Sequence, residues 1–319
     1  MNVKLFIENA GKIYSPPVEE GITINWDRKG NPGKLTFTVI KSPDLVFYEG
    51  NAVGFKVDGK PVFYGFVFTK EESKDGKIKV TVYDQLRYLK NKDSYILTNR
   101  TASEILQMVI ADFQLRGGSI ADTGWRISKV DADNKALFDI IQSALDETVQ
   151  NTGRLYVMYD DYGSLTLRNI EEMKLDYLLD AETAQDYDYS SSIDSNTYNR
   201  IRLAYDNKEK GTRDMYVAQD GANINAWGVL QYFEKISTPT NGQNKANALL
   251  ALYDMKTRKL SASKAFGDTR VRAGSSIIAK FDFNDVELMR YMVVDKVQHD
   301  FKNNEHTMKL NLIGGEFVA

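Results

Sequence analysis

Segments that alternate apolar and polar residues recur at both ends of this chain, and they limit its possible folds more than any other feature. Residues 34–40 (KLTFTVI) and 77–84 (KIKVTVYD) each alternate a large apolar residue with lysine or threonine. A period of two is typical of a β-strand that buries one face and exposes the other. Asp75-Gly76 before the second segment is a strong hairpin signal, and NPG at 31–33 indicates another turn. Residues 1–90 are therefore predicted to form mainly strands.

The two ends of the chain also resemble each other. The segment EGNAVGFKVDGKPVFYGFVFTKEESKDGKIKVTVYD begins at Glu49, and AGSSIIAKFDFNDVELMRYMVVDKVQHDFKNNEHTMKLNLIG begins at Ala273. Each contains an apolar strand, a turn with aspartate, a long strand with aromatic and β-branched residues, a second polar turn and an alternating strand. Two explanations are open: an internal duplication, or the pattern that any two β-hairpins share.

The middle of the chain changes to a helical period. Residues 101–118 open with Thr101 and Glu104 in the spacing of a capping box, and a stop is expected at Gly117-Gly118. A second apolar stripe follows in NKALFDIIQSALDETVQNTG and is expected to end at Gly153. RLYVMYDDYGSLTLRNI is typical of a hairpin. We expect residues 96–180 to form a small α+β unit between strand-rich parts.

Beyond residue 185 the chain is polar before it returns to strands. DYDYSSSIDSNTYN (186–199) is typical of a connector, and strands are expected to resume in 200–220 and again from about 270 to 313. A lysine-rich amphipathic helix is predicted between them. Its inward residues are Ala246, Leu249, Leu250 and Tyr253.

Composition excludes several classes of function. The 319 residues predict two or three domains, since one core seldom grows beyond roughly 250–300 residues. The net charge of −3 argues against a dedicated nucleic-acid binder, and no apolar run approaches the ~20 residues of a membrane span. The absence of cysteine excludes thiol catalysis, disulfides and Cys-based zinc sites, and it favours folding in a reducing cytoplasm.

Both histidines of the chain, His299 and His306, lie in the short stretch VQHDFKNNEH. They could bind a metal ion, but zinc needs three or four ligands. The additional ligands would be Asp295, Asp300 or Glu305, in no known spacing. The alternative is that both histidines occupy ordinary positions on two adjacent strands. We predict that the chain has no metal, no cofactor and no catalytic residue.

The stretch DADNKALFDIIQ begins like a calcium-binding EF-hand loop, with Asp131, Asp133 and Lys135 at alternate positions. It lacks the glycine at its sixth position, and Gln142 stands where a bidentate glutamate is required. Helix N-capping by Asp133 or Asn134 is the preferred interpretation.

Two further groups could carry a function. Paired carboxylates could hydrolyse glycosidic bonds, as in a cell-wall lytic enzyme, and exposed tryptophans could bind a glycan. The alternatives are a solvated acidic connector and tryptophans that lie in a core or a subunit contact. The residues concerned are Asp180, Glu182, Asp186 and Asp188, and Trp26, Trp125 and Trp227. The sequence contains no nucleophile elbow, HExxH, P-loop or dinucleotide motif.

Several segments, taken in order, resemble the baseplate hub proteins of contractile phage tails and phage-tail-like bacteriocins, of the XkdQ/YqbQ type. They are GKLTFTVIKSPDLVFYEGNAVGFKVDGKPVFYGFVF, VTVYDQLRYLKN, TASEILQMVIADFQL, NTGRLYVMYDDYGSLTLRN, YNRIRLAYDN, AFGDTRVRAGSSIIAKFDF and VVDKVQHDFKNNEHTMKLNLIGG. They span nearly the whole chain in the order that this family shows. The resemblance implies an α+β, mainly β fold, with two related β-barrel domains that form a tube wall and a small helix-containing α+β domain between them.

The resemblance also implies a division of the chain. Residues 1–95 would form the first β-barrel domain, and residues 96–185 the helix-containing domain. Residues 186–238 would be a connector with strands that complete the first barrel region. Residues 239–319 would form a second barrel-type domain with one amphipathic helix.

The function implied by the resemblance is structural. Two barrels in each chain of a homotrimer would give six similar units, which would match a hexameric tail tube on one side and a trimeric spike on the other. The expected partners are the tube, the spike and other baseplate proteins, with DNA only as transient cargo of the channel and no stable membrane insertion. The protein would be made in the bacterial cytoplasm and join a phage or phage-tail-like particle. A peptidoglycan hydrolase and a glycan-binding tail component are the alternatives.

Overall fold

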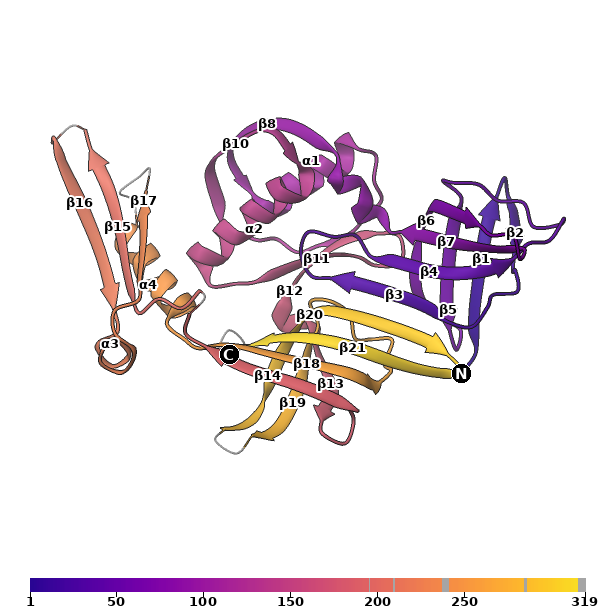
Figure 1. Ribbon diagram of the computed structural model, residues 1–319. Helices are drawn as coiled ribbons and strands as arrows, with labels where there is room; N and C mark the ends of the chain where they lie inside the picture. The colour runs from indigo at the N-terminus through magenta and orange to yellow at the C-terminus, as the bar shows by residue number, and fades with distance from the viewer. Residues whose placement is uncertain (195, 209, 237–240, 284–285, 315–319) are drawn as a thin grey trace.

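The computed structural model of the chain describes residues 1–194, 196–208, 210–236, 241–283 and 286–314, and it is mainly β with few helices. Thirteen strands form one continuous sheet, which runs through the body of the molecule (Figure 1). Its main path is β14-β18-β21-β20-β3-β4-β7-β6-β5-β1-β2, and β13 joins it through β19, which pairs with β20. Three smaller sheets lie outside this path.

The first seven strands make up one end of the long sheet, which we call the first β-module. All of them are antiparallel to their neighbours. The predicted turn at Asp75-Gly76 joins β6 to β7, with Gly76 at φ +77°, and η1 (Gln85–Lys90) follows the last strand. The strands are β1 (Val3–Asn9), β2 (Lys12–Tyr14), β3 (Ile22–Asp27), β4 (Lys34–Ile40), β5 (Ala52–Val57), β6 (Lys60–Glu72) and β7 (Lys77–Tyr83).

Six strands from the second half of the chain make up the other end, which we call the second β-module. β13 lies parallel to β19, whereas the other neighbours are antiparallel. The strands are β13 (Lys174–Asp180), β14 (Asp186–Ser192), β18 (Thr257–Phe266), β19 (Ser276–Phe283), β20 (Val286–Lys302) and β21 (Glu305–Gly314).

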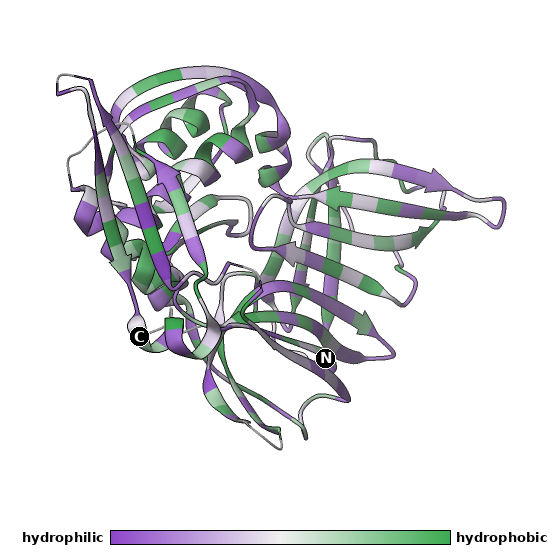
Figure 2. Cartoon of the chain, turned by 60° about the vertical axis from the view of Figure 1, so that its left-hand side comes forward, coloured by the Kyte–Doolittle hydropathy of each residue, from purple (hydrophilic) through white to green (hydrophobic). Residues whose placement is uncertain are grey.

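The alternation predicted from the sequence explains where the core lies. Leu35, Phe37 and Val39 of β4 are buried, whereas the lysine and threonines between them are half-buried. The same alternation is visible along the strands in Figure 2, where hydrophobic and hydrophilic residues follow one another. Buried residues of both β-modules belong to one hydrophobic core, because the two modules share a sheet. The strands predicted at 34–40 and 77–84 are confirmed.

No closed barrel is found among the described strands, so the two-barrel layout is not confirmed. The reason lies in β20, which is 17 residues long. Its second half, from Lys296 to Phe301, pairs with β3 of the first β-module. The backbone groups that would be needed to close either module on itself therefore join the two modules into one open sheet.

Two helices and five strands form an α+β unit, as predicted, and cover one side of the body (Figure 1). The hairpin expected in residues 154–170 is confirmed as β11 and β12. The elements are β8 (Lys92–Thr101), α1 (Ala102–Asp112), β9 (Gly117–Ile120), β10 (Arg126–Ala136), α2 (Leu137–Thr152), β11 (Tyr156–Asp160), β12 (Leu165–Asn169) and η2 (Ile170–Met173).

The capping box of α1 is confirmed, but its predicted stop is wrong. Thr101 Oγ1 accepts the Glu104 N–H at 3.1 Å, and the Glu104 carboxylate accepts the Thr101 N–H at 3.2 Å. The helix ends at Asp112, and Gln114 turns the chain at φ +51°. The pair Gly117-Gly118 begins β9 instead, where Gly118 lies against β12.

α2 ends at Gly153 as predicted, with φ +69°, but its N-cap was predicted at the wrong residue. Ala136 occupies the N-cap position, and its side chain makes no capping hydrogen bond. Asp133 accepts a hydrogen bond from Ser94 Oγ at 2.7 Å, and Asn134 has φ +50° where β10 bulges against β8. N-capping by Asp133 or Asn134 is excluded because the β8–β10 ladder continues through this region.

A third group of elements, which we call the outer unit, projects from the body at the left of Figure 1. Helix α4 packs on β15 and β16; of the four residues predicted to face inward, Ala246 and Leu249 are fully buried, whereas Leu250 and Tyr253 are half-buried. The unit lies between β14 and β18 in the sequence. Its elements are β15 (Arg200–Asn207), β16 (Thr212–Gln219), α3 (Gly221–Trp227), β17 (Gln231–Lys235) and α4 (Gly242–Tyr253).

Two expectations for residues 186–238 are wrong. DYDYSSS is the strand β14, which pairs with β18 along its whole length, and not a connector. The strands in 200–220 do not complete the first β-module, because β15 pairs only with β16 and β17 among the described strands. A polar strand is stable at this place because it lies at the edge of the sheet and buries only part of one face.

Candidate functional site

The two histidines lie side by side on β20 and β21. His299 Nδ1 and His306 Nε2 are 2.8 Å apart, and His299 Nε2 is 2.9 Å from the Val271 carbonyl oxygen. Because a carbonyl only accepts, His299 carries its proton on Nε2, and its Nδ1 accepts the His306 Nε2–H. The His299 ring is fully buried between Trp26 and Phe301.

This arrangement keeps both imidazoles neutral and leaves no free ligand on His299. Burial and the neighbouring His306 lower the pKa of His299 to about 3, and burial lowers the pKa of His306 to about 4. Asp295 binds Arg28 at 3.1 Å, and Asp300 accepts the Thr23 hydroxyl at 3.0 Å. Over the described ranges, no three His, Cys, Asp or Glu side chains gather as a metal site would require.

The EF-hand-like stretch also serves local structure. Its first two aspartates belong to β10, and the second binds Ser94. Asp131 and Lys129 form an exposed ion pair at 2.5 Å. The remaining residues of the stretch lie in the strand and in α2, so the chain does not wrap around a point as a calcium loop does.

The carboxylates proposed for hydrolysis do not form a catalytic pair. Asp180 accepts the backbone N–H groups of Glu182 and Thr183 at 3.0 and 2.9 Å, which fixes the turn before β14. Asp186 and Asp188 alternate on one face of β14 and are exposed. A general acid is normally raised in pKa by burial in an apolar pocket, and neither exposed aspartate has that environment.

The tryptophans do not form a shared platform. Trp26 lies in the main core and is 7% exposed. Trp125 packs against the core of the α+β unit, and Trp227 lies half-buried at the end of α3 in the outer unit. The three residues therefore belong to three different parts of the molecule.

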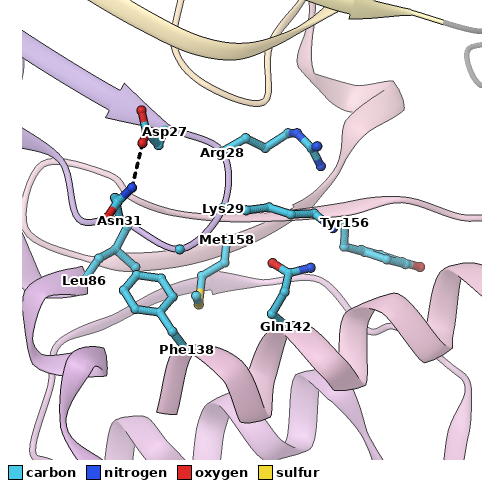
Figure 3. Close-up of a pocket in the computed structure, with 10 residues that line it drawn as sticks. Asp27, Arg28, Lys29, Asn31, Leu86, Phe138, Gln142, Tyr156 and Met158 are labelled. Atoms are coloured by element: carbon cyan, nitrogen blue, oxygen red, sulfur yellow. Dashed lines mark hydrogen bonds between the residues drawn. The ribbon is translucent and has the colours of Figure 1, made fainter. Parts of the chain in front are cut away.

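Neither described pocket resembles a ligand site. The narrower one lies where the loop after β3 meets α2, and its volume is about 10 Å³, which is room for one water molecule. Figure 3 shows Phe138 and Met158 beneath that loop, and Asn31 bonded to Asp27 at 2.7 Å. The wider one, about 380 Å³, lies beside the start of α1, where Ser103 and other polar groups already bond to one another.

A buried polar cluster, which the sequence analysis missed, lies where the two β-modules meet the α+β unit. Asp84 follows β7 and accepts the Gly33 N–H at 2.9 Å, and Asp160 ends β11 and accepts the Gln85 N–H at 3.3 Å. Burial raises the pKa of both carboxyls, and the charge of Asp160 raises that of Asp84 further. Each residue follows an alternating strand, but no sequence motif links the two.

Arg272 of the second β-module completes this cluster. Its Nη2 donates to the Asp160 carbonyl oxygen at 2.7 Å, and its guanidinium lies 3.9 Å from the centre of the Tyr159 ring and 5.4 Å from that of Trp26. Burial lowers the pKa of Arg272, and the nearby tyrosine and carboxylates oppose that change. The side chain thus ties the second β-module to the α+β unit and to the first β-module.

One face extends over eight consecutive strands of the long sheet, β14-β18-β21-β20-β3-β4-β7-β6, and we call it the eight-strand face. On β3, β4, β7 and β21 threonine, asparagine and charged side chains cover most of it. On β6 it carries Phe66, and Val293 and Ile313 of β20 and β21 pack there against the α+β unit. Both signs of charge are interspersed. Lys296 Nζ, for example, lies 3.5 Å from the Asp27 carboxylate. This face is the candidate functional surface; among the described strands it is bounded by the edge strand β14 at one end and by the Thr69–Glu72 segment of β6, which pairs only with β7, at the other.

The two β-modules repeat the same strand pairing across this face. β6 bulges against β7 between Val67 and Thr69, and β20 bulges against β21 between Val294 and Lys296. Val67 lies opposite Val82, the third buried residue of β7, and Val294 lies opposite Leu312, the third buried residue of β21. The two bulges therefore occupy the same register. The three-strand meander β5-β6-β7 therefore corresponds to β19-β20-β21.

The turn before each meander repeats as well. In each module a glycine N–H donates to a valine carbonyl of the long strand at 2.8 Å, and that valine N–H donates back to the residue after the glycine, at 2.9 Å in the first module and 2.8 Å in the second. Both glycines have positive φ, +87° and +92°. The two sets are Gly50, Asn51 and Val67 in the first module, and Gly274, Ser275 and Val294 in the second.

The strands on the other side of each meander match too. β4 lies beside β7 and β3 beside β4, just as β18 lies beside β21 and β14 beside β18. One difference separates the modules: β1 is antiparallel to β5, whereas β13 is parallel to β19. The residues that fix the correspondence are Ile24, Leu35 and Val82 in one module, and Tyr189, Leu260 and Leu312 in the other.

This fold is that of phage tail proteins. The tail protein of Neisseria meningitidis MC58 superposes with a TM-score of 0.70 over 99% of this chain and 98% of its own, at 12% identity. A component of the E. coli type VI secretion system, described as structurally similar to the T4 tail proteins gp27 and gp5, gives a TM-score of 0.56 over 98% of this chain and 78% of its own, at 10% identity. At these identities the likeness concerns the fold alone.

The sequence narrows that class to one family. The family model described as YQBQ-like matches residues 22–313, and the phage-like element PBSX protein XkdQ of Bacillus subtilis (strain 168) is 32% identical over 307 residues, 93% of this chain and 92% of that protein. The chain belongs to the YQBQ-like family. Its fold is that of phage tail proteins, and no enzyme family is indicated. In the part of the chain that the structure describes, no helix is long and apolar enough to cross a membrane.

Proposed function

We propose that this chain is the structural hub of a contractile tail baseplate, in which three copies form a ring between a hexameric tail tube and a trimeric spike. The observation that carries the proposal is the repeated strand pairing of the two β-modules. Each copy would present two equivalent units, so three copies would present six. Such a ring closes when one contact repeats by a fixed rotation.

The eight-strand face would line the central channel of this ring. Over β3, β4, β7 and β21 it is mainly polar and carries both lysines and carboxylates, so a passing DNA would meet no uniformly positive wall there. A strongly basic lining would bind phosphates and slow the passage. DNA is therefore proposed as transient cargo in a phage, and ions would take its place in a phage-tail-like bacteriocin.

The remaining parts would serve contacts outside the channel. The divisions at residues 1–95 and 96–185 stay proposals, whereas those at 186–238 and 239–319 do not, because β14 belongs to the second β-module and α4 to the outer unit. The outer unit projects from the body in Figure 1, where other baseplate proteins could reach it, whereas the α+β unit packs against Val293 and Ile313 of the eight-strand face. The T4 gp27 and gp5 likeness noted for the E. coli neighbour supports spike and tube proteins as partners. The protein would be made in the bacterial cytoplasm and become part of the particle.

A native mass measurement of the full chain, with and without the tail tube protein of the same cluster of genes, tests the hub proposal. Without the tube protein we expect a complex with three copies of this chain. With the tube protein we expect the same complex to bind a ring of six tube-protein copies. A complex with one, two or six copies of this chain bound to the tube would contradict it. Activity on peptidoglycan in a zymogram, lost on D186N and D188N, would point to the hydrolase instead.

A further inference from the structure

The junction between the two β-modules within one chain shows how such modules pair. The second half of β20 lies antiparallel to β3, with Gln298 opposite Asn25 and His299 opposite Ile24. This is the one place in the described sheet where the second β-module continues into the first. Because the modules are equivalent, each strand of this junction has a counterpart in the other module. The counterpart of β20 is β6, and the counterpart of β3 is β14.

In the single chain these two equivalent strands have no such partner. β14 ends the sheet and pairs only with β18 among the described strands, and the segment of β6 from Thr69 to Glu72 pairs only with β7. Glu71, Glu72 and Ser190 are exposed. Within this segment Lys70 donates to the Phe47 carbonyl, and Glu72 forms an ion pair with Lys41. An open edge of this kind is a template for another strand.

We propose that β6 of one copy pairs antiparallel with β14 of the next copy, in the register that β20 and β3 use within the chain. This inference rests on the proposed ring and names its subunit contact. It turns the eight-strand face into an unbroken sheet around the channel. The pairs, written with the β14 residue first, are Asp188 with Ser73, Tyr189 with Glu72, Ser190 with Glu71, Ser191 with Lys70, and Ser192 with Thr69.

Side-chain chemistry favours this register over its neighbours. It sets a hydroxyl group opposite each polar residue of the channel face, and no two like charges lie opposite each other. A shift of two residues in one direction would place Asp188 opposite Glu71, and a shift of two in the other direction would place it opposite Asp75. Like charges opposite each other destabilise a strand pair. A shift of one residue would turn Tyr189 out of the core side.

The internal junction also tells which pairs suit a cross-link. The Arg28 N–H donates to the Asp295 carbonyl at 2.8 Å, so these residues form a hydrogen-bonded pair at the end of the ladder. Such pairs alternate with non-hydrogen-bonded pairs, whose Cα atoms are about 4.5 Å apart, and Asn25 with Gln298 is one of the latter. That separation lies within the disulfide range of about 4.4–6.8 Å. Ser190 and Glu71 are the corresponding pair between copies.

The test uses cysteines, of which the natural chain has none. The full-length variant E71C/S190C is oxidised at the concentration where the native mass is measured and is run on a non-reducing gel. We expect covalent dimers and trimers that reducing agent dissolves. N25C/Q298C is the positive control, because it should form the same bond within one copy. S73C/S190C is the register control, since its cysteines would lie diagonally, about 7–8 Å apart in Cα position.

Three outcomes decide the inference. At least roughly tenfold more covalent trimer from E71C/S190C than from S73C/S190C supports it, given the steep distance limit of a disulfide. A three-copy mass without E71C/S190C cross-links, while N25C/Q298C closes, overturns the strand contact and leaves the hub proposal standing. A chain that stays monomeric and uncross-linked, both alone and with the tube protein, overturns the contact and the hub together.

Discussion

At the scale of single residues, His299 makes the fold sensitive to acid. Its pKa is lowered to about 3 in the folded chain, against about 6.5 when unfolded. Below pH 6.5 the unfolded state binds a proton on this imidazole, whereas the folded state does not. The free energy of unfolding should therefore fall by about 1.4 kcal/mol for each unit by which the pH is lowered. We expect a loss of about 2 kcal/mol between pH 7 and pH 5 from this residue, measured by urea unfolding.

Two variants separate this effect from general acid sensitivity. H299Q cannot titrate, so its stability should fall less steeply between pH 7 and pH 5, even though it starts lower. H306Q keeps an amide N–H that can donate to His299 Nδ1, and it should retain most of the His299 contribution. Equal slopes for H299Q and the natural chain would show that the buried imidazole does not control the decline.

Arg272 should tolerate no substitution by lysine. Its guanidinium stacks on Tyr159 and donates to the Asp160 carbonyl at the same time, which an ammonium group cannot reproduce. We expect R272K to lower the free energy of unfolding by about 2–3 kcal/mol, because the buried ammonium group loses the stacking on Tyr159 and the fixed hydrogen bond to the Asp160 carbonyl. The control is R270K, whose arginine is exposed, and its loss should stay below about 1 kcal/mol. Similar losses in both variants would contradict the central role of the cluster.

At the scale of elements, the repeated glycines offer a paired test of the two β-modules. Gly50 and Gly274 share a positive φ, and alanine is strained there by about 1–2 kcal/mol. A Cβ at Gly50 would meet nothing within 4 Å, whereas one at Gly274 would lie 2.5 Å from Val157 Cγ1. G274A should therefore be less stable than G50A by at least about 1 kcal/mol in urea unfolding. Equal losses would mean that the α+β unit does not press on this turn.

Much of this level could be predicted from the sequence, and the reason is local. The alternation in β4 and β7, the Asp75-Gly76 turn and the capping box at Thr101 depend on residues a few positions apart. The strand β14 was missed because five serines and aspartates among its seven residues leave no apolar alternation to detect. It forms a strand because β18 supplies the backbone partners, which a local pattern does not record.

The candidate surface and the polar cluster depend on contacts that are distant in the sequence. Thr23 donates a hydrogen bond to Asp300 across the junction of the two β-modules, and Arg272 of the second β-module donates to the Asp160 carbonyl of the α+β unit. A single sequence contains no signal that pairs such positions. The similarity of the two ends could be predicted, but the joining of the modules into one open sheet could not, since the long strand β20 can pair either within its module or beyond it.

At the scale of the whole molecule, the outer unit should be removable. Ser192 and Thr257 pair directly, so the chain leaves and re-enters the sheet at one place. The Tyr198 N–H also donates to the Tyr253 carbonyl at 3.0 Å, which closes the unit at its base. Replacing residues 194–255 with a short Gly/Ser turn should keep the β-sheet signal in circular dichroism.

The free energy of unfolding should fall by no more than about 2 kcal/mol, mainly because α4 no longer packs on α2. E71C/S190C should still cross-link in this shortened chain, because neither cysteine lies in the outer unit. A shortened chain that loses cooperative unfolding would show that the outer unit is part of the main core.

The position of the outer unit has a consequence for the particle. The hairpin of β3 and β4 closes with the short loop at residues 28–33, whereas the equivalent hairpin of β14 and β18 carries the entire outer unit. Around a closed ring, this appendage would decorate every second module only. A neighbouring protein that binds the strands would meet six equivalent sites, and one that binds the outer unit would meet three. A difference in the length of a single loop would thus set which symmetry each surrounding protein encounters.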